Sequence, residues 1–119
     1  DEKDVCEKYG IFPSKKEWEG KILFVETCEE KPQPELFRKE LLALKERGVF
    51  DVVNGVLVGK PQDETYYEEY KTIYLEVIDK KELSIVYNVN FGHALPRCVL
   101  PYGAMAKVDM EQKKIWIEE

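Results

Sequence analysis

Residues 21–26, KILFVE, open the part of the sequence that decides the fold. The run is short and apolar, is rich in β-branched and aromatic side chains, and ends in an acidic residue, which is the pattern of a buried strand. Two comparable runs follow, VVNGVLV at 52–58 and LSIVYNVNF at 83–91. Their nearly continuous apolar character favours central strands of a parallel sheet over half-exposed strands.

Two helices are predicted between these strands. From residue 34 to residue 47 apolar side chains recur at helical spacing, with Pro34 near the start and Gly48 just past the end. After the second strand, Asp63 suits the N-cap of a helix that continues to about Lys80. The apolar stripe of this second helix consists of Tyr66, Tyr70, Ile73 and Val77.

The order of the elements predicts the fold class. Two short alternating runs, AMAKVDM at 104–110 and KIWIEE at 114–119, predict a C-terminal antiparallel hairpin. Three strands alternating with two helices, followed by this hairpin, predict a small α/β domain with a parallel central sheet, right-handed crossovers and an antiparallel edge. Residues 1–17 are polar with scattered aromatic side chains, so we interpret them as an arm or linker remnant before a domain at 18–119.

Composition and charge exclude several classes of function. With 24 acidic and 18 basic residues the formal charge is −6, and no basic run interleaved with aromatics is present, so we expect no nucleic-acid partner. Three cysteines, spaced too irregularly for a disulfide framework or a zinc site, favour a reducing cytoplasm and no metal. No apolar stretch approaches the roughly 20 residues of a spanning helix, so no membrane association is expected. The sequence begins at Asp1 without methionine, so a cut from a longer protein has to be considered.

The only histidine, His93, is the first candidate for chemistry. It lies two residues past the predicted end of the third strand, and functional groups of α/β sheets collect beyond the carboxyl ends of strands. Glu26 ends the first strand, so parallel strands would deliver a carboxylate and an imidazole to one sheet edge, where the carboxylate could hold the reactive tautomer. The residues alone leave two alternatives open: a structural histidine bonded to backbone, and an acidic loop in which Glu26 is simply solvated.

A nucleophile for this pair is missing. The two serines, Ser14 and Ser84, lie outside any glycine-flanked elbow, and Ser84 falls inside a predicted strand. Cys98 follows His93 by five residues, but a cysteine in an apolar loop is more often buried filler than a nucleophile. No pair of His or Cys residues has the spacing of metal ligands.

Three segments carry a resemblance to a known family. WEGKILFVETCEE at 18–30, GVLVGK at 55–60 and NFGHALPRCVLPYG at 90–103 resemble, in the same order, the C-terminal domain of the LD-carboxypeptidase family of serine peptidases, which includes the microcin C immunity proteins. The resemblance implies a swivelling β/α domain. It also implies a Ser–Glu–His triad divided between two domains, with Glu26 as the acid and His93, in its F-G-H-x-x-P context, as the general base.

The resemblance also implies what this chain lacks. The family's serine lies on an elbow in an N-terminal domain that these 119 residues do not include, so the chain alone is expected to be inactive. The family uses no metal or other cofactor, and its substrates are muropeptides with an L,D amide bond or peptide–nucleotide conjugates of the microcin type. The expected function is amide hydrolysis by the full-length enzyme.

Partners and alternatives follow from the same reasoning. We expect the missing N-terminal domain to cover apolar side chains around His93, or a homodimer to form on them; the candidates are Phe91, Leu95, Val99 and Leu100. One alternative function is a non-catalytic interaction or regulatory module. Another is a swivelling phosphocarrier domain with a phosphorylated His93, for which Arg97 is the nearby basic group.

Overall fold

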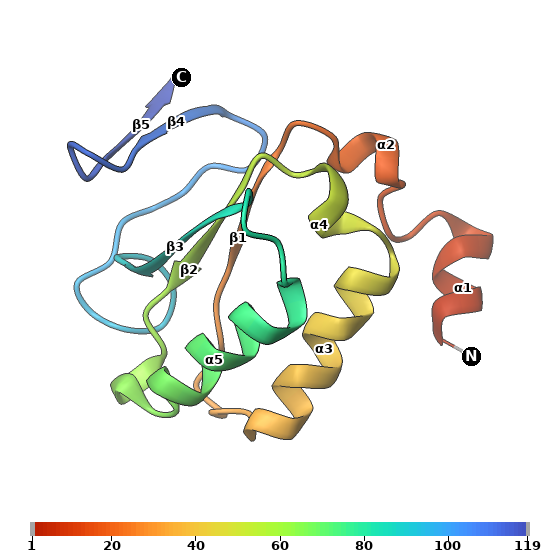
Figure 1. Cartoon of the computed structure of the whole chain (residues 1–119), viewed down its shortest axis with the longest axis horizontal. Helices are drawn as coiled ribbons and strands as arrows, with labels where there is room; N and C mark the ends of the chain where they lie inside the picture. Colours follow the sequence, from red (N-terminus) through yellow and green to blue (C-terminus); the bar gives the residue numbers. More distant parts are fainter. Residues whose placement is uncertain (1, 119) are drawn as a thin grey trace.

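The computed structural model describes residues 2–118, and their elements confirm the predicted fold class (Figure 1). A parallel sheet packs against helices, and an antiparallel hairpin ends the chain. In order, the elements are α1 (Glu2–Tyr9), α2 (Lys15–Trp18), β1 (Ile22–Val25), α3 (Pro34–Glu46), α4 (Val49–Val52), β2 (Gly55–Gly59), a 3₁₀ turn (Gln62–Glu64), α5 (Tyr67–Ile78), β3 (Ser84–Val89), β4 (Met105–Asp109) and β5 (Lys114–Glu118).

The sheet has the order β1-β2-β3, and both of its strand pairs are parallel. Helices α3 and α5 connect successive strands, pack against each other and cover the same face of the sheet (Figure 1). Alternate strand residues point to this face, so the apolar strand runs contribute half of their side chains to the core. The core side chains include Leu23, Val56 and Val58 from the strands, Phe37 and Leu41 from α3, and Tyr70, Ile73, Tyr74, Val77 and Ile78 from α5.

The hairpin corrects one expectation. It was predicted as an antiparallel edge of the central sheet, but β4 and β5 pair only with each other and form a separate sheet. The hairpin lies on the other face of the parallel sheet, away from α3 and α5 (Figure 1). A groove of 290 Å³ separates the two, with Phe24 and Leu57 on the sheet side and Ile115 and Ile117 on the hairpin side.

Two predicted boundaries were wrong. Residues 52–58 were expected to be one strand, but Val49–Val52 form α4 and β2 begins only at Gly55. Val49 and Phe50 are both buried in this short helix. A few buried apolar residues in a row give the same sequence pattern in a short helix as in a buried strand. Asp63 was expected to cap a helix, but it lies inside the 3₁₀ turn with a left-handed φ of 54°, and α5 begins at Tyr67.

The N-terminal residues contain more regular structure than an arm. Besides α1, the short helix α2 begins with a capping box, in which the Ser14 hydroxyl accepts a hydrogen bond from the Glu17 backbone N–H and the Glu17 carboxylate accepts one from the Ser14 backbone N–H. Phe12 and Trp18 contact each other and pack against the core. Residue 1 lies outside the described part, and the domain boundary at residue 18 stays a prediction.

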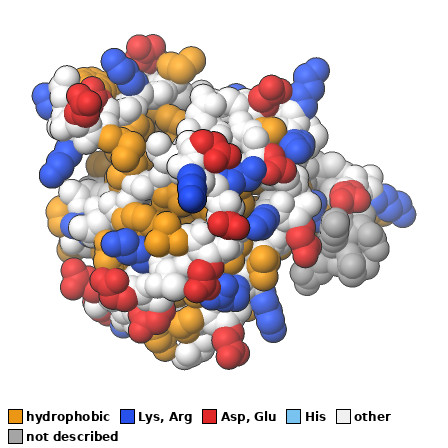
Figure 2. Space-filling view, in the orientation of Figure 1, with side chains coloured by type: hydrophobic (Ala, Val, Ile, Leu, Met, Phe, Trp, Pro, Cys, Tyr) orange, Lys and Arg blue, Asp and Glu red, His pale blue; other side chains and the backbone are white. Residues whose placement is uncertain are grey.

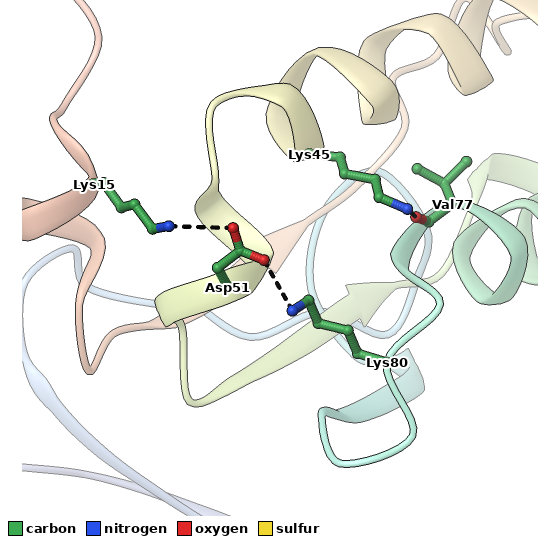
Figure 3. A network of polar contacts seen from close by, with 5 residues as sticks. All are labelled: Lys15, Lys45, Asp51, Val77 and Lys80. Carbon is green, nitrogen blue, oxygen red and sulfur yellow. Dashed lines mark hydrogen bonds and ion pairs between the residues drawn. The ribbon is translucent and has the colours of Figure 1, made fainter.

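Polar contacts join the helices at the amino ends of the strands (Figure 3). The carboxylate of Asp51 in α4 accepts from the ammonium groups of Lys15 in α2, at 3.2 Å, and Lys80 after α5, at 2.8 Å. These hydrogen bonds, that of Lys80 first, lower the pKa of Asp51. Lys45 in α3 donates to the carbonyl of Val77 in α5 at 2.6 Å. The contacts lie far from the carboxyl ends of the strands, where the candidate site is found.

Candidate functional site

Glu26 and His93 meet at the carboxyl edge of the parallel sheet. Glu26 directly follows β1, and His93 follows β3 by four residues. Glu26 Oε2 lies 2.8 Å from His93 Nδ1. The predicted proximity of the two side chains is therefore confirmed, although they come from positions 67 residues apart in the chain. About a third of each side chain remains exposed, so the pair is open to a reacting partner.

Gly92 makes room for this contact. Its φ of +93° lies in the region that only glycine adopts at low cost. A β-carbon at this position would overlap the Glu26 carboxylate, which lies directly against the Gly92 backbone. The glycine before the histidine therefore does two things: it allows the turn that aims His93, and it lets Glu26 approach the imidazole.

Phe91 anchors the segment that carries His93, and this corrects an expectation. Phe91 was predicted to belong to an exposed patch, but it is buried, because it packs edge-to-face on Phe24 with ring centroids 5.6 Å apart. It also fills the space above Gly59, where a β-carbon would lie 2.9 Å from the Phe91 ring. The backbone N–H of Cys98 donates to the Asn90 carbonyl at 2.7 Å and closes the loop.

The rest of the predicted patch fits the expectation in part. Leu95 and Val99 are 75% and 90% exposed, whereas Leu100 is half-buried at the groove under the hairpin. The face drawn in Figure 2 shows hydrophobic side chains at the surface between charged side chains of both signs. Loop 92–103, which carries His93, thus exposes the apolar side chains of Leu95 and Val99, while Phe91 is buried just before the loop begins.

The geometry of the pair defines its chemistry. An ionised carboxylate only accepts hydrogen bonds, so the Glu26 contact favours the tautomer with the proton on Nδ1. That tautomer leaves a lone pair on Nε2, the nitrogen on the opposite side of the ring. An imidazole held in this way can accept a proton at Nε2 while the carboxylate stabilises the charged ring.

A second carboxylate contacts the ring, and the sequence reasoning did not single it out. Glu29 Oε2 lies 2.8 Å from His93 Nε2. Glu29 belongs to the acidic loop after β1, where the residues alone left open that Glu26 is simply solvated. Glu29 follows Glu26 by three residues in ETCEE. No helix or strand pattern in this stretch predicts that both side chains contact the His93 ring. Glu29 lies in a local turn, in which the Lys31 N–H donates to the Cys28 carbonyl at 3.1 Å, and this turn brings its side chain back to the ring.

No serine of the chain lies at this edge. Ser84 begins β3 and therefore lies at the opposite, amino edge of the parallel sheet, and Ser14 caps α2, whose partner α4 leads into the amino end of β2. Cys98 is exposed, and within residues 2–118 its sulfur makes no hydrogen bond with His93. The described residues also contain no group of three His, Cys, Asp or Glu side chains arranged to hold a metal ion. None of the helices in this part of the chain has the length and apolarity needed to cross a membrane.

Comparisons with known proteins place this domain in a family. Residues 5–108 match the LD-carboxypeptidase C-terminal domain. A protein of Treponema pallidum (strain Nichols) named "Putative carboxypeptidase" is 31% identical over 101 residues, which are 82% of this chain and 29% of that protein. An MccF-like protein from Streptococcus pneumoniae, crystallised in complex with AMP, is 50% identical and superposes with a TM-score of 0.89 over 98% of this chain and 34% of that one.

These comparisons confirm the resemblance and the fold. The chain spans about a third of the length of the relatives it matches. The superposition on the MccF-like structure covers 98% of the chain, including its three parallel strands, the helices on one face and the hairpin. The chain therefore belongs to the LD-carboxypeptidase C-terminal domain family.

Proposed function

We propose that this chain is the C-terminal part of a serine peptidase and supplies the acid and base of a Ser–Glu–His triad. The contact between Glu26 Oε2 and His93 Nδ1 carries the proposal. Glu26 holds the Nδ1–H tautomer, and Nε2 takes the proton of a serine hydroxyl as that oxygen attacks an amide carbonyl. The imidazolium, stabilised by Glu26, then returns the proton to the leaving amine, and water releases the acyl group from the serine.

The serine belongs to a part of the protein outside these 119 residues. Support comes from the length of the relatives, of which the chain covers 29% and 34%, and from the position of Ser14 and Ser84 away from the site. The exposed apolar side chains of Leu95 and Val99 beside His93 suit contact with that part or with a second copy of the chain. Orientation and a base cannot replace a nucleophile, so the isolated chain is inactive.

The substrate is a small peptide with an amide bond near its C-terminus. Two kinds fit the family: muropeptides with an L,D amide bond, and peptide–nucleotide conjugates of the microcin type. The MccF-like relative was crystallised with AMP, the nucleotide part of such a conjugate, and this favours the second kind. The three unpaired cysteines fit a reducing cytoplasm as the place of the reaction.

The contacts of His93 argue against the phosphocarrier alternative. Both ring nitrogens lie 2.8 Å from a carboxylate oxygen, so a phosphoryl group on either nitrogen would face a negative charge. Arg97, the basic group nearby, directs its guanidinium to the Gly92 carbonyl at 3.4 Å. Only a measurement of peptidase activity distinguishes a non-catalytic module from the proposed peptidase.

The test compares Glu26→Gln with Glu30→Gln in the full-length enzyme, using an L,D-linked muropeptide and a peptide–adenylate as substrates. Glu26→Gln should fold normally and lower kcat by about 10⁴-fold, the size of the acid-to-amide effect in serine proteases. Glu30 is exposed and makes no ion pair with any residue in the described part of the chain, so its amide variant should retain activity. Normal turnover by Glu26→Gln, or turnover by residues 1–119 alone, would overturn the divided triad.

A further inference from the structure

His93 contacts two carboxylates, and the fold holds them in different ways. The Glu26 side chain is 36% exposed, but it directly follows β1 and lies against the backbone of Gly92. The Glu29 side chain is 66% exposed, and within residues 2–118 its contact with His93 is its one hydrogen bond or ion pair. Glu26 is therefore a fixed partner of the ring, whereas Glu29 is free to rotate away from it.

The contact with Glu29 constrains where the ring carries its protons. An ionised carboxylate accepts a hydrogen bond and cannot donate one, so Glu29 can bond to Nε2 only while Nε2 carries a hydrogen. In a protonated ring both nitrogens carry hydrogen, and both carboxylates are satisfied. A neutral ring carries only one hydrogen, while Glu26 faces Nδ1 and Glu29 faces Nε2. When that hydrogen is on Nε2, beside Glu29, Nδ1 has no hydrogen to donate to Glu26.

Either state blocks general-base chemistry. The proposed triad needs an unprotonated Nε2, because that nitrogen must accept the serine proton. While the Glu29 carboxylate lies 2.8 Å from a protonated Nε2, no lone pair is available there, and the carboxylate also occupies the space that a serine oxygen would need, within about 3 Å of the nitrogen. Glu29 therefore competes with the nucleophile for the same position beside Nε2.

We propose that Glu29 is a blocking residue that holds His93 in an unreactive state until the nucleophile-bearing part and the substrate displace it. The proposal rests on the proposed role of His93 as general base. On displacement the Glu29 side chain rotates into solvent and Nε2 loses its proton to water. A protonated ring then keeps its hydrogen on Nδ1, a neutral ring takes up a proton from water at Nδ1, and in both cases Glu26 holds the Nδ1–H tautomer. Because the Glu29 side chain is exposed, a change of its rotamer is enough for this step, and β1 and β3 need not rearrange.

The lone histidine makes the test direct, because its ring nitrogens give the only imidazole signals in the chain. The ¹⁵N resonances of Nδ1 and Nε2 report which nitrogen carries the proton, and they should be measured for the 119-residue chain at a pH where the ring is neutral. The variant is Glu29→Ala and the matched control is Glu30→Ala, the next acid in the same exposed loop. Circular dichroism of each variant checks that the fold is retained.

Glu29→Ala should move the Nε2 resonance toward that of an unprotonated nitrogen and the Nδ1 resonance toward that of a protonated one. Glu30→Ala should leave both resonances in place. Unchanged resonances in Glu29→Ala, or equal movement in both variants, would overturn the blocking role. Because no nucleophile takes part in this measurement, its failure would leave the divided triad standing, and loss of the triad would be detected separately by the activity of Glu26→Gln.

Discussion

The two faces of the parallel sheet are covered in different ways. On one face Leu23, Val56 and Val58 pack beneath α3 and α5 and are almost completely buried. On the other face the β4–β5 hairpin leaves grooves of 290 and 230 Å³ between itself and the sheet. The segment that carries His93 is attached to the second face, because Phe24 of that face packs on Phe91, just before Gly92 and His93. The first face therefore supplies most of the stability, and the second supplies the position of the site.

Truncation of a helix residue on the first face should have the largest effect on stability. Tyr74 of α5 is 1% exposed and contacts Phe37 and Tyr87. Replacing it by alanine removes a large buried ring and leaves a cavity, so Tyr74→Ala should lower the free energy of unfolding by about 3–5 kcal/mol. Urea denaturation of the chain and the variant measures this. A loss below 1 kcal/mol would show that the helical face is not the main source of stability.

Gly92→Ala tests the link between the second face and the site. The alanine must adopt a positive φ and overlap the Glu26 carboxylate, so the variant should lose about 1–3 kcal/mol and break the contact between Glu26 and His93. The Nδ1 proton resonance of His93, measured at a pH where the ring is protonated and both nitrogens carry hydrogen, reports that contact.

Gly103→Ala is the matched control for this prediction. Gly103 has a φ of +75° but no neighbour within 4 Å of an added β-carbon, so its variant carries the backbone strain alone. It should retain the Nδ1 proton resonance of His93. If both variants retain that resonance, Gly92 does not position Glu26.

Alkaline pH should weaken the first face specifically. Burial, followed by the nearby Tyr87 and Tyr70, raises the pKa of Tyr74 well above its ordinary value. The unfolded chain then releases this proton more easily, so the stability contributed by neutral Tyr74 is complete below pH 10 and falls as pH rises above it. At pH 11 this loss is about 1.4 kcal/mol.

Tyr74→Phe removes that titration and keeps the ring. The variant should match the parent chain at pH 7 and become less sensitive to alkali, which denaturation at pH 7 and pH 11 would measure. Equal losses in both proteins would mean that the Tyr74 hydroxyl is not desolvated in the fold.

Sequence patterns predicted the strands and helices with strong periodicity. β1, α3 and β3 agree with their predicted runs within a few residues. The β-branched and aromatic side chains of the two strand runs and the helical spacing of α3 distinguish strand from helix. The four residues of α4 are too few for that distinction. The hairpin pattern was correct, but alternation along a strand does not say which sheet its partner belongs to.

The candidate site was predictable to the extent that it depends on strand ends. Glu26 and His93 follow the carboxyl ends of two parallel strands, so topology alone brings them to one edge, and the resemblance to the family added their expected roles. The burial of Phe91 was missed because its neighbours in the sequence belong to an exposed loop. The contact of Glu29 with the ring was missed because it depends on the turn at Lys31, whose φ of 51° no sequence pattern indicates.

The smallest effect is expected on the hairpin, and it gives the sharpest comparison of the two faces. Ile115 of β5 is half-buried and lines the groove of 290 Å³ beside Ile117. Its side chain already borders open space, so truncation removes little contact with the sheet, and Ile115→Ala should lower the free energy of unfolding by no more than about 1 kcal/mol. Urea denaturation under the conditions used for Tyr74→Ala makes the two values comparable. A loss as large as that of Tyr74→Ala would mean that the hairpin is part of the cooperative core, and the division between a stabilising face and a site-positioning face would then be wrong.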